Sequence, residues 1–161
     1  MDPDLIAPSV ESSRSADRLA LGRRGEELAA AYLQQVGYRL VAANFSVPVG
    51  RSRVGTLINA EMDLVAYEGL TLCFIEVKSR GSDWFAPPQA NVDRRKQRQI
   101  VRAARAYRRM FSVEDEPYRY DVVTVVMADV ADDSLAEIKL LRNFWQEAGL
   151  RKRQWSEYFY D

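Results

Sequence analysis

The chain has 161 residues, and its 23 acidic and 23 basic residues balance to a formal net charge of zero. This length is sufficient for one compact domain with a buried core. Because the net charge does not indicate a nucleic-acid partner, any prediction of one has to rest on the local arrangement of charges.

The chain has no histidine and a single cysteine, Cys73. This composition excludes a disulfide framework, a cysteine-based zinc site and every catalytic arrangement that needs histidine. Oxygen ligands remain for a metal, and they favour Mg²⁺ or Mn²⁺. No apolar run approaches the length of a membrane span or a signal-peptide core, so we expect a cytoplasmic protein without a membrane partner.

The first 36 residues divide into a lead-in and a helix. Residues 1–17 are rich in Pro, Ser and Asp without periodicity, which predicts a disordered segment. Residues 18–36 have helical periodicity, and Gly37 is a suitable C-terminal cap.

Glu26 interrupts an otherwise apolar face of this helix, which also carries Ala29 and Leu33. A carboxylate on a buried face is costly unless it is paired or binds a metal. We therefore consider Glu26 a candidate third carboxylate of a site; the alternative is a partly exposed glutamate stabilised by the helix dipole.

Residues 38–45 are predicted to form a first strand at the edge of a sheet, followed by a polar loop over residues 46–55. Residues 59–78 have the pattern of a β-hairpin, with two runs of Val, Ile, Leu and Phe around a Glu68-Gly69 turn.

This hairpin carries acidic residues at strand spacing. Glu61 and Asp63 are two residues apart, as are Glu76 and Lys78, so each pair shares one face of its strand. A two-residue turn at Glu68-Gly69 would set Glu61 opposite Glu76, with Asp63 one diagonal step away. Since like charges across a ladder are destabilising, such a cluster needs a cation, either Lys78 or a bound metal.

Residues 93–111 form a second predicted helix with an apolar stripe on one side and basic residues on the other. Arginine suits phosphate better than lysine does, because its guanidinium donates two parallel hydrogen bonds. We therefore predict nucleic-acid binding here, with a solvated helix face as the alternative. The basic positions are Arg94, Arg95, Arg98, Arg102, Arg105 and Arg109, together with Lys96 at the start of the apolar stripe.

The remaining elements complete one domain, which we place at residues 18–145. Residues 118–127 are rich in Val and predict a strand buried on both faces. We expect Asp121 in this strand to have a structural role, paired with Arg119 or with an arginine of the second helix; a role in the site is the alternative. Residues 135–141 are compatible with a last short strand, and residues 146–161 form a basic and aromatic tail. The order helix, strand, hairpin, helix, strand predicts an α/β fold with a mixed sheet.

The combination of Asp63 with Glu76-Val77-Lys78 resembles the active site of the PD-(D/E)XK nuclease superfamily. Within it, residues 22–126 resemble the YraN-like family of small, uncharacterised bacterial proteins. The chain departs from the family pattern at Ala60, where the family usually has Gly, and in an insertion over residues 47–58. The matching positions are Gly22, Glu26, Ala29, Gly37-Tyr38, Ala43-Asn44, Glu61, Asp63-Leu64, Phe74, Glu76, Lys78, Arg80, Lys96, Arg119 and Asp121.

This resemblance implies a restriction-endonuclease-like α-β-β-β-α-β core, with a mixed central sheet flanked by helices. It also implies metal-dependent hydrolysis of phosphodiester bonds in DNA. Asp63, Glu76 and the main-chain carbonyl of Val77 would hold Mg²⁺ or Mn²⁺, with Glu26 or Glu61 acting through water. Lys78 would position the attacking water or the phosphate, and Arg80 would join the helix arginines in binding the backbone.

Two other functions remain open from the sequence. The chain is also compatible with a non-catalytic nucleic-acid-binding module of the same fold, or with an oligomerisation or scaffold protein. For the nuclease we expect DNA rather than RNA as the partner, with branched or junction DNA suggested by analogy alone. Because one site cuts one strand, cleavage of a duplex or a junction would require a homodimer.

Overall fold

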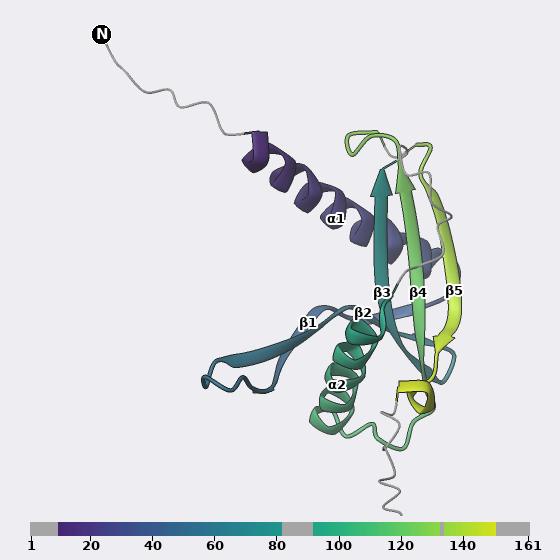
Figure 1. Cartoon of the computed structure of the whole chain (residues 1–161). Helices are drawn as coiled ribbons and strands as arrows, with labels where there is room; N and C mark the ends of the chain where they lie inside the picture. Colours follow the sequence, from purple (N-terminus) through teal and green to yellow (C-terminus); the bar gives the residue numbers. More distant parts are fainter. Residues whose placement is uncertain (1–9, 82–91, 133, 151–161) are drawn as a thin grey trace, which may run out of the picture.

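The computed structural model describes residues 10–81, 92–132 and 134–150. They form two long helices, five strands and one short 3₁₀ helix (Figure 1). In chain order the elements are α1 (Val10–Gln35), β1 (Arg39–Arg51), β2 (Leu57–Glu68), β3 (Thr71–Gly81), α2 (Arg94–Met110), β4 (Tyr118–Met127), β5 (Glu137–Trp145) and η1 (Glu147–Leu150).

The five strands form one mixed sheet in the order β1-β2-β3-β4-β5. Strands β3 and β4 are parallel and the other neighbouring pairs are antiparallel. The chain passes through α2 between the two parallel strands, as a parallel pair requires a crossover. The predicted α/β fold with a mixed sheet and flanking helices is therefore confirmed.

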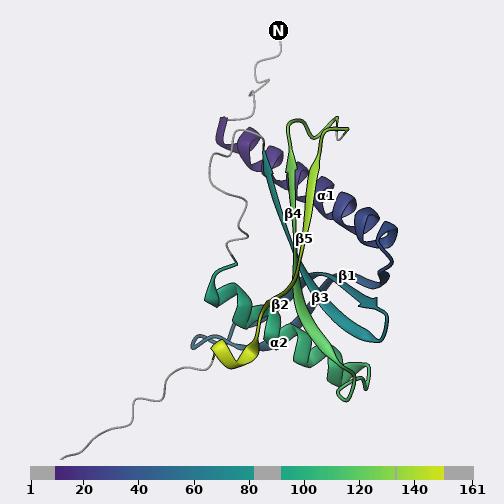
Figure 2. The same cartoon turned by 90° about the vertical axis from the view of Figure 1, so that its right-hand side faces the viewer.

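The two helices cover opposite faces of the sheet, which gives three layers (Figures 1 and 2). On one face, Leu33 of α1 packs in a core that includes Ile75 of β3. On the other face, Ile100 and Tyr107 of α2 pack in a core that includes Phe74. Because successive strand residues point to opposite faces, β3 contributes side chains alternately to the two cores.

The outer parts of β1 and β2 leave the sheet as a two-stranded arm, visible on the left of Figure 1. Strand β1 pairs with β2 from Arg39↔Tyr67 to Arg51↔Leu57, whereas β2 pairs with β3 only from Leu64↔Ile75 to Glu68↔Thr71. The prediction of a polar loop over residues 46–55 was therefore wrong for residues 46–51, which belong to β1, and right for residues 52–55, which lie in the turn before β2. Pro48 is tolerated because β1 is an edge strand and its register shifts at this residue.

The β2–β3 turn also differs from the prediction. Glu68 pairs with Thr71, so the turn residues are Gly69 and Leu70, and Gly69 has a φ of 58° that suits glycine. The register is consequently shifted by two residues from the predicted one. Continuing it toward the site sets Asp63, rather than Glu61, across from Glu76.

Both ends of the fold extend beyond the predicted limits. Residues 10–17 are helical, so α1 begins at Val10 rather than at position 18, and β5 continues to Trp145. By contrast, β4 has the predicted bounds, and α2 is capped by Asp93, whose side chain accepts a hydrogen bond from the Lys96 amide. The predicted lead-in over residues 1–9 and the tail over residues 151–161 lie outside the described residues.

Asp121 has the structural role that the sequence predicted. Its side chain is 0 % exposed and accepts hydrogen bonds from Arg119 Nε at 2.9 Å and from the Asn143 amide at 2.8 Å. Tyr38 OH lies 3.2 Å from the same carboxylate. The cluster joins β1, β4 and β5 on the α1 side of the sheet.

Across the three described stretches of the chain, no helix has both the length and the apolar character needed to cross a membrane.

Candidate active site

The candidate site lies where β2 separates from β3. Here Asp63 of β2 accepts a hydrogen bond of 2.7 Å on Oδ2 from the backbone amide of Val77 in β3. The strands no longer pair at this point, so the side chain satisfies a backbone donor that the ladder leaves free. The bond fixes Asp63 beside the next acidic residue, Glu76.

Glu76 is buried at the centre of the site, with 3 % of its surface exposed. Its Oε1 lies 3.1 Å from Lys78 Nζ and 3.7 Å from Lys96 Nζ. Its Oε2 is also buried, yet it has no hydrogen-bond partner among the described residues. A buried carboxylate oxygen without a protein partner is rare in folded proteins, and such an oxygen is available to a bound ion or water.

The pKa of Glu76 is raised to about 7, mainly by burial and next by the negative charge of Asp63. Lys96 and Lys78 act in the opposite direction, because each favours the ionised form. The carboxyl group is thus poised to lose its proton near neutral pH, and a bound cation would favour that loss.

Helix α1 brings a third carboxylate, Glu26, to the same place. Burial and the charge of Asp63 raise the pKa of Glu26, while a hydrogen bond from the Asn44 side chain lowers it. Asn44 has a φ of 49°, a left-handed conformation that asparagine tolerates better than most residues. Asn44 therefore positions Glu26, a role that the sequence alone did not indicate.

The approach of α1 to β3 depends on Gly25. A Cβ atom at this position would lie 1.7 Å from Ser79 Oγ and 2.8 Å from Ser79 Cβ. Glycine thus permits a contact between helix and strand that no other residue would allow without a shift. The next residue is Glu26, so this close contact also sets the distance of Glu26 from the site.

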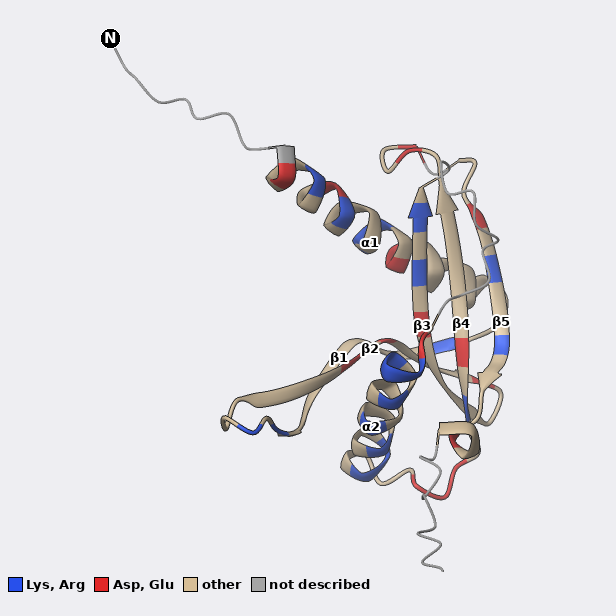
Figure 3. Cartoon of the chain, in the orientation of Figure 1, with Lys and Arg blue, Asp and Glu red and all other residues tan. Residues whose placement is uncertain are grey.

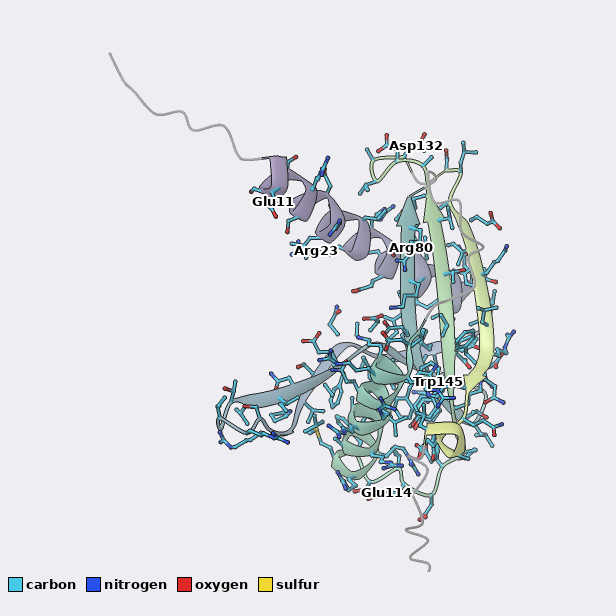
Figure 4. The ribbon with its side chains drawn as sticks, viewed as in Figure 1. Glu11, Arg23, Arg80, Glu114, Asp132 and Trp145 are labelled. Carbon is cyan, nitrogen blue, oxygen red and sulfur yellow. The ribbon has the colours of Figure 1, made fainter. Side chains whose placement is uncertain are left out.

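An open cleft of about 560 Å³ connects these residues to solvent. Its lining includes Glu26, Asp63, Glu76 and Lys78, with cationic side chains at Arg18 and Arg80. Arg80 is labelled in Figure 4, on β3 beside α1. A cleft lined by both acidic and cationic side chains suits a phosphate held next to a metal ion.

The residues present fit a hard divalent cation. Within residues 10–81, 92–132 and 134–150, no three acidic or cysteine side chains converge to form a complete metal-binding cluster. Mg²⁺ does not need one, because it usually binds through one or two carboxylates and retains several waters. Asp63 and the unpartnered Oε2 of Glu76 supply two such carboxylates, and Glu26 lines the same cleft.

The structure thus brings together most of the predicted site residues: Glu26, Asp63, Glu76, Val77, Lys78 and Arg80 all line the cleft, and Lys96 contacts Glu76. Glu61 is different, because it is exposed and pairs with Ser46 on the arm, outside the lining. Arg18 lines the cleft although the sequence did not single it out; the available signal was its position four residues before Gly22 and eight before Glu26, on the same face of the helix.

Basic residues recur along the length of α2, coloured blue on the ribbon in Figure 3. Arg94, Arg95, Arg98, Arg102 and Arg109 are exposed. Arg105 is exposed as well but forms an ion pair of 2.7 Å with Glu147 of η1. Arg108 stacks over the Tyr118 ring and donates to the Glu114 carbonyl, so it belongs to the packing of the domain.

Comparison with known proteins places the chain in a family. Residues 25–125 match the uncharacterised protein family UPF0102. A UPF0102 protein of Chlorobium limicola is 36% identical over 136 residues, which cover 83% of this chain and 98% of that protein. One of Koribacter versatilis is 38% identical over 146 residues, 91% of each chain. One of Geobacter sulfurreducens is 42% identical over 107 residues, 66% of this chain and 76% of that protein. The resemblance to the YraN-like family is thereby confirmed, and the chain belongs to the uncharacterised protein family UPF0102.

Proposed function

We propose that the protein is a metal-dependent nuclease that hydrolyses phosphodiester bonds in DNA. The observation that carries this proposal is the buried, unpartnered Oε2 of Glu76 beside Asp63, in a cleft that opens to solvent. The buried Glu76 beside the half-buried Asp63 is expensive for a protein that only binds nucleic acid, because charges removed from water must be desolvated. The cost is offset if the pair binds a cation.

Asp63 and Glu76 hold Mg²⁺ or Mn²⁺ in this proposal, with the Val77 carbonyl completing the protein ligands. The ion would lower the pKa of the attacking water and stabilise charge that develops on the phosphate. The Asp63–Val77 hydrogen bond keeps one carboxylate in place before any ligand arrives. Such preorganisation lowers the cost of assembling the site.

Lys78 and Lys96 flank Glu76 and would act on the phosphate in different ways. Both ammonium groups lie within 4 Å of Glu76 Oε1, and 23% and 31% of their side-chain surfaces are exposed. From there they can reach a phosphate in the cleft. Lys78 orients the phosphate or the attacking water, and Lys96 adds positive charge from the first turn of α2.

The exposed arginines of α2 would bind the sugar-phosphate backbone. Residues 94–110 contain seven arginines and one lysine and no acid. Contacts of this kind are independent of sequence and weaken with salt, because they release condensed counterions.

The test is titration calorimetry with Mg²⁺ and Mn²⁺ on the wild type and on Asp63→Asn, followed by incubation with labelled single-stranded, duplex and branched DNA. We expect metal binding and metal-dependent nicking by the wild type alone, with similar DNA affinity in both proteins. Because Asp63 is a metal ligand in this proposal, Asp63→Asn should lower the metal affinity by more than the roughly 10–100-fold typical of residues that only support a metal ligand. Absence of metal binding, with DNA affinity intact, would instead identify a binding module.

A further inference from the structure

A second groove lies between the β1–β2 arm and α2, away from the acidic cleft. Its volume is about 570 Å³. The arm contributes Arg51 and Ile58 to its lining, and α2 contributes Arg102, Arg105 and Arg109. No acidic residue belongs to this lining. The groove therefore combines positive charge with an apolar surface.

The arginines of this groove are not equally available to a ligand. Arg105 is held by Glu147 at 2.7 Å, and Arg51 donates to the Gly55 carbonyl of its own turn at 2.8 Å. In the described part of the chain, neither Arg102 nor Arg109 has an ion-pair partner. These two guanidinium groups are therefore the most available to an anion in the groove, and among the described residues Arg51 has no carboxylate partner either.

The arm itself is poorly explained by packing. Val54 near its tip is 88 % exposed, and Leu57 is 54 % exposed. Folding gains little from burying so small a part of these side chains. An exposed two-stranded ribbon beside an arginine-rich helix is better explained by contact with an extended partner.

The groove continues the line of the acidic cleft along α2. Lys78 lines both the cleft and a smaller depression of about 410 Å³ that also involves Arg95 and Lys96. From Lys96, the helix rises about 20 Å to Arg109, which corresponds to about six phosphate spacings of one strand in a duplex. A strand bound at the acidic cleft can therefore reach the arm groove.

We propose that the arm groove is a remote anchoring site for the sugar-phosphate backbone of the nucleic acid that occupies the acidic cleft. The inference rests on the proposed nuclease function for the identity of that ligand. Arg102 and Arg109 bind phosphates, while Ile58 and the aliphatic parts of the arm contact sugars or bases. Residues 47–58, which form the outer part of the arm, thereby select substrates that extend several nucleotides beyond the cleaved bond.

The test uses the full-length protein without metal and measures fluorescence anisotropy of labelled single-stranded DNA. Two lengths are compared, about four and about twelve nucleotides, because only the longer one spans the roughly 20 Å between the sites. The variants are the double substitution Arg102→Ala with Arg109→Ala, and a shortened arm in which residues 49–58 are replaced by a two-residue turn. The double substitution Arg23→Ala with Lys139→Ala is the charge-matched control, since both residues are exposed and lie outside the groove.

We expect the Arg102/Arg109 variant to bind the longer DNA roughly tenfold more weakly. The slope of log affinity against log salt concentration should become shallower by about one unit for each lost phosphate contact. Its affinity for the shorter DNA should stay that of the wild type. The shortened arm should behave in the same way, and the control should bind both lengths normally. Unchanged affinity for the longer DNA in both groove variants would overturn the proposal.

Failure of the nuclease function gives a different result. If the wild type neither binds Mg²⁺ nor nicks DNA, yet the groove variants still lose affinity for the longer DNA alone, the anchoring site stands without catalysis. If the wild type nicks DNA and the groove variants bind and nick the longer DNA equally well, the nuclease stands and the anchoring site is excluded.

Discussion

Asp63 Oδ2 accepts a 2.7 Å hydrogen bond from the Val77 amide at the point where β2 leaves β3. The Asp63 side chain thus replaces a missing interstrand hydrogen bond and places its carboxylate beside Glu76. The site is therefore built into the branching of the fold, since the departure of β2 both frees the amide and opens the cleft. Stability and function should be separable by the choice of substitution.

The first prediction compares two replacements of Asp63. Asp63→Asn keeps an oxygen acceptor for the Val77 amide, whereas Asp63→Ala leaves that amide without a protein partner. We expect Ala to lower the free energy of unfolding by about 1–2 kcal/mol more than Asn, the usual cost of an unsatisfied buried donor. Urea denaturation measures the difference. Equal stability of the two variants would mean that water replaces the carboxylate at no cost.

The second prediction concerns the contact between Gly25 and Ser79. Gly25→Ala forces its methyl group into Ser79 and should destabilise the protein by about 1–3 kcal/mol, the range for overpacked sites. Adding Ser79→Gly removes both clashing atoms and should restore part of the loss. Gly22→Ala is the matched control on the same helix, because a Cβ atom there meets nothing within 4 Å. Thermal denaturation of the three variants measures these differences. A double variant no more stable than Gly25→Ala would contradict this account.

The third prediction concerns the effect of the buried Glu76 charge on the pH dependence of stability. With a pKa of about 7 when folded and 4.5 when unfolded, the group binds its proton more tightly in the native state. Stability should therefore fall as the pH rises from 4.5 through 7. In the presence of a chelator, Glu76→Gln should be more stable than the wild type at pH 8, by up to about 3 kcal/mol at about 1.4 kcal/mol for each pH unit.

The same variant should lose that advantage near pH 4, where both states of the wild type are protonated. Denaturant unfolding at the two pH values measures the change. A variant less stable than the wild type at pH 8 would show that pairing with Lys78 and Lys96 outweighs the burial of the charge. Metal binding, measured in parallel by calorimetry, should be lost in the variant.

The fourth prediction concerns the acid stability of the cluster around Glu68. Hydrogen bonds from Arg142 and Arg119 lower the pKa of Glu68 to about 2. Its contribution to stability is therefore complete above pH 4.5 and is lost as the pH falls toward 2. Glu68→Gln should be less stable than the wild type at pH 7, on the order of 1 kcal/mol once solvent screening is allowed for.

This difference should shrink steadily between pH 5 and pH 2, as thermal denaturation at a series of pH values would reveal. Glu137→Gln serves as a control because, within the described stretches, the ion pair of Glu137 is with the exposed Lys139 on β5. If the stability difference between Glu68→Gln and the wild type stayed constant with pH, the stabilising contacts of Arg119 and Arg142 would not depend on the charge of Glu68.

The sequence determined the elements whose signals are local. The bounds of β4 follow from a continuous run of branched residues, and α2 follows from its apolar stripe and the capping side chain of Asp93. Asp63, Glu76 and Lys78 could likewise be selected as candidates, because two-residue spacing puts acids on one strand face and the motif resembles that of a known superfamily. These signals involve residues only a few positions apart.

Only the tertiary structure decided which of these residues meet. A shift of two residues at the Gly69-Leu70 turn brings Asp63, instead of Glu61, to Glu76, and such a shift leaves the pattern of alternating faces unchanged. Asn44 reaches Glu26, and Gly25 meets Ser79, from elements far apart in the chain. Distant partners also make the α2 arginines differ in their availability to a ligand, since Glu147 forms an ion pair with Arg105, whereas Arg102 lines the groove without such a partner among the described residues. Local periodicity carries no information on these contacts, because packing between layers fixes them.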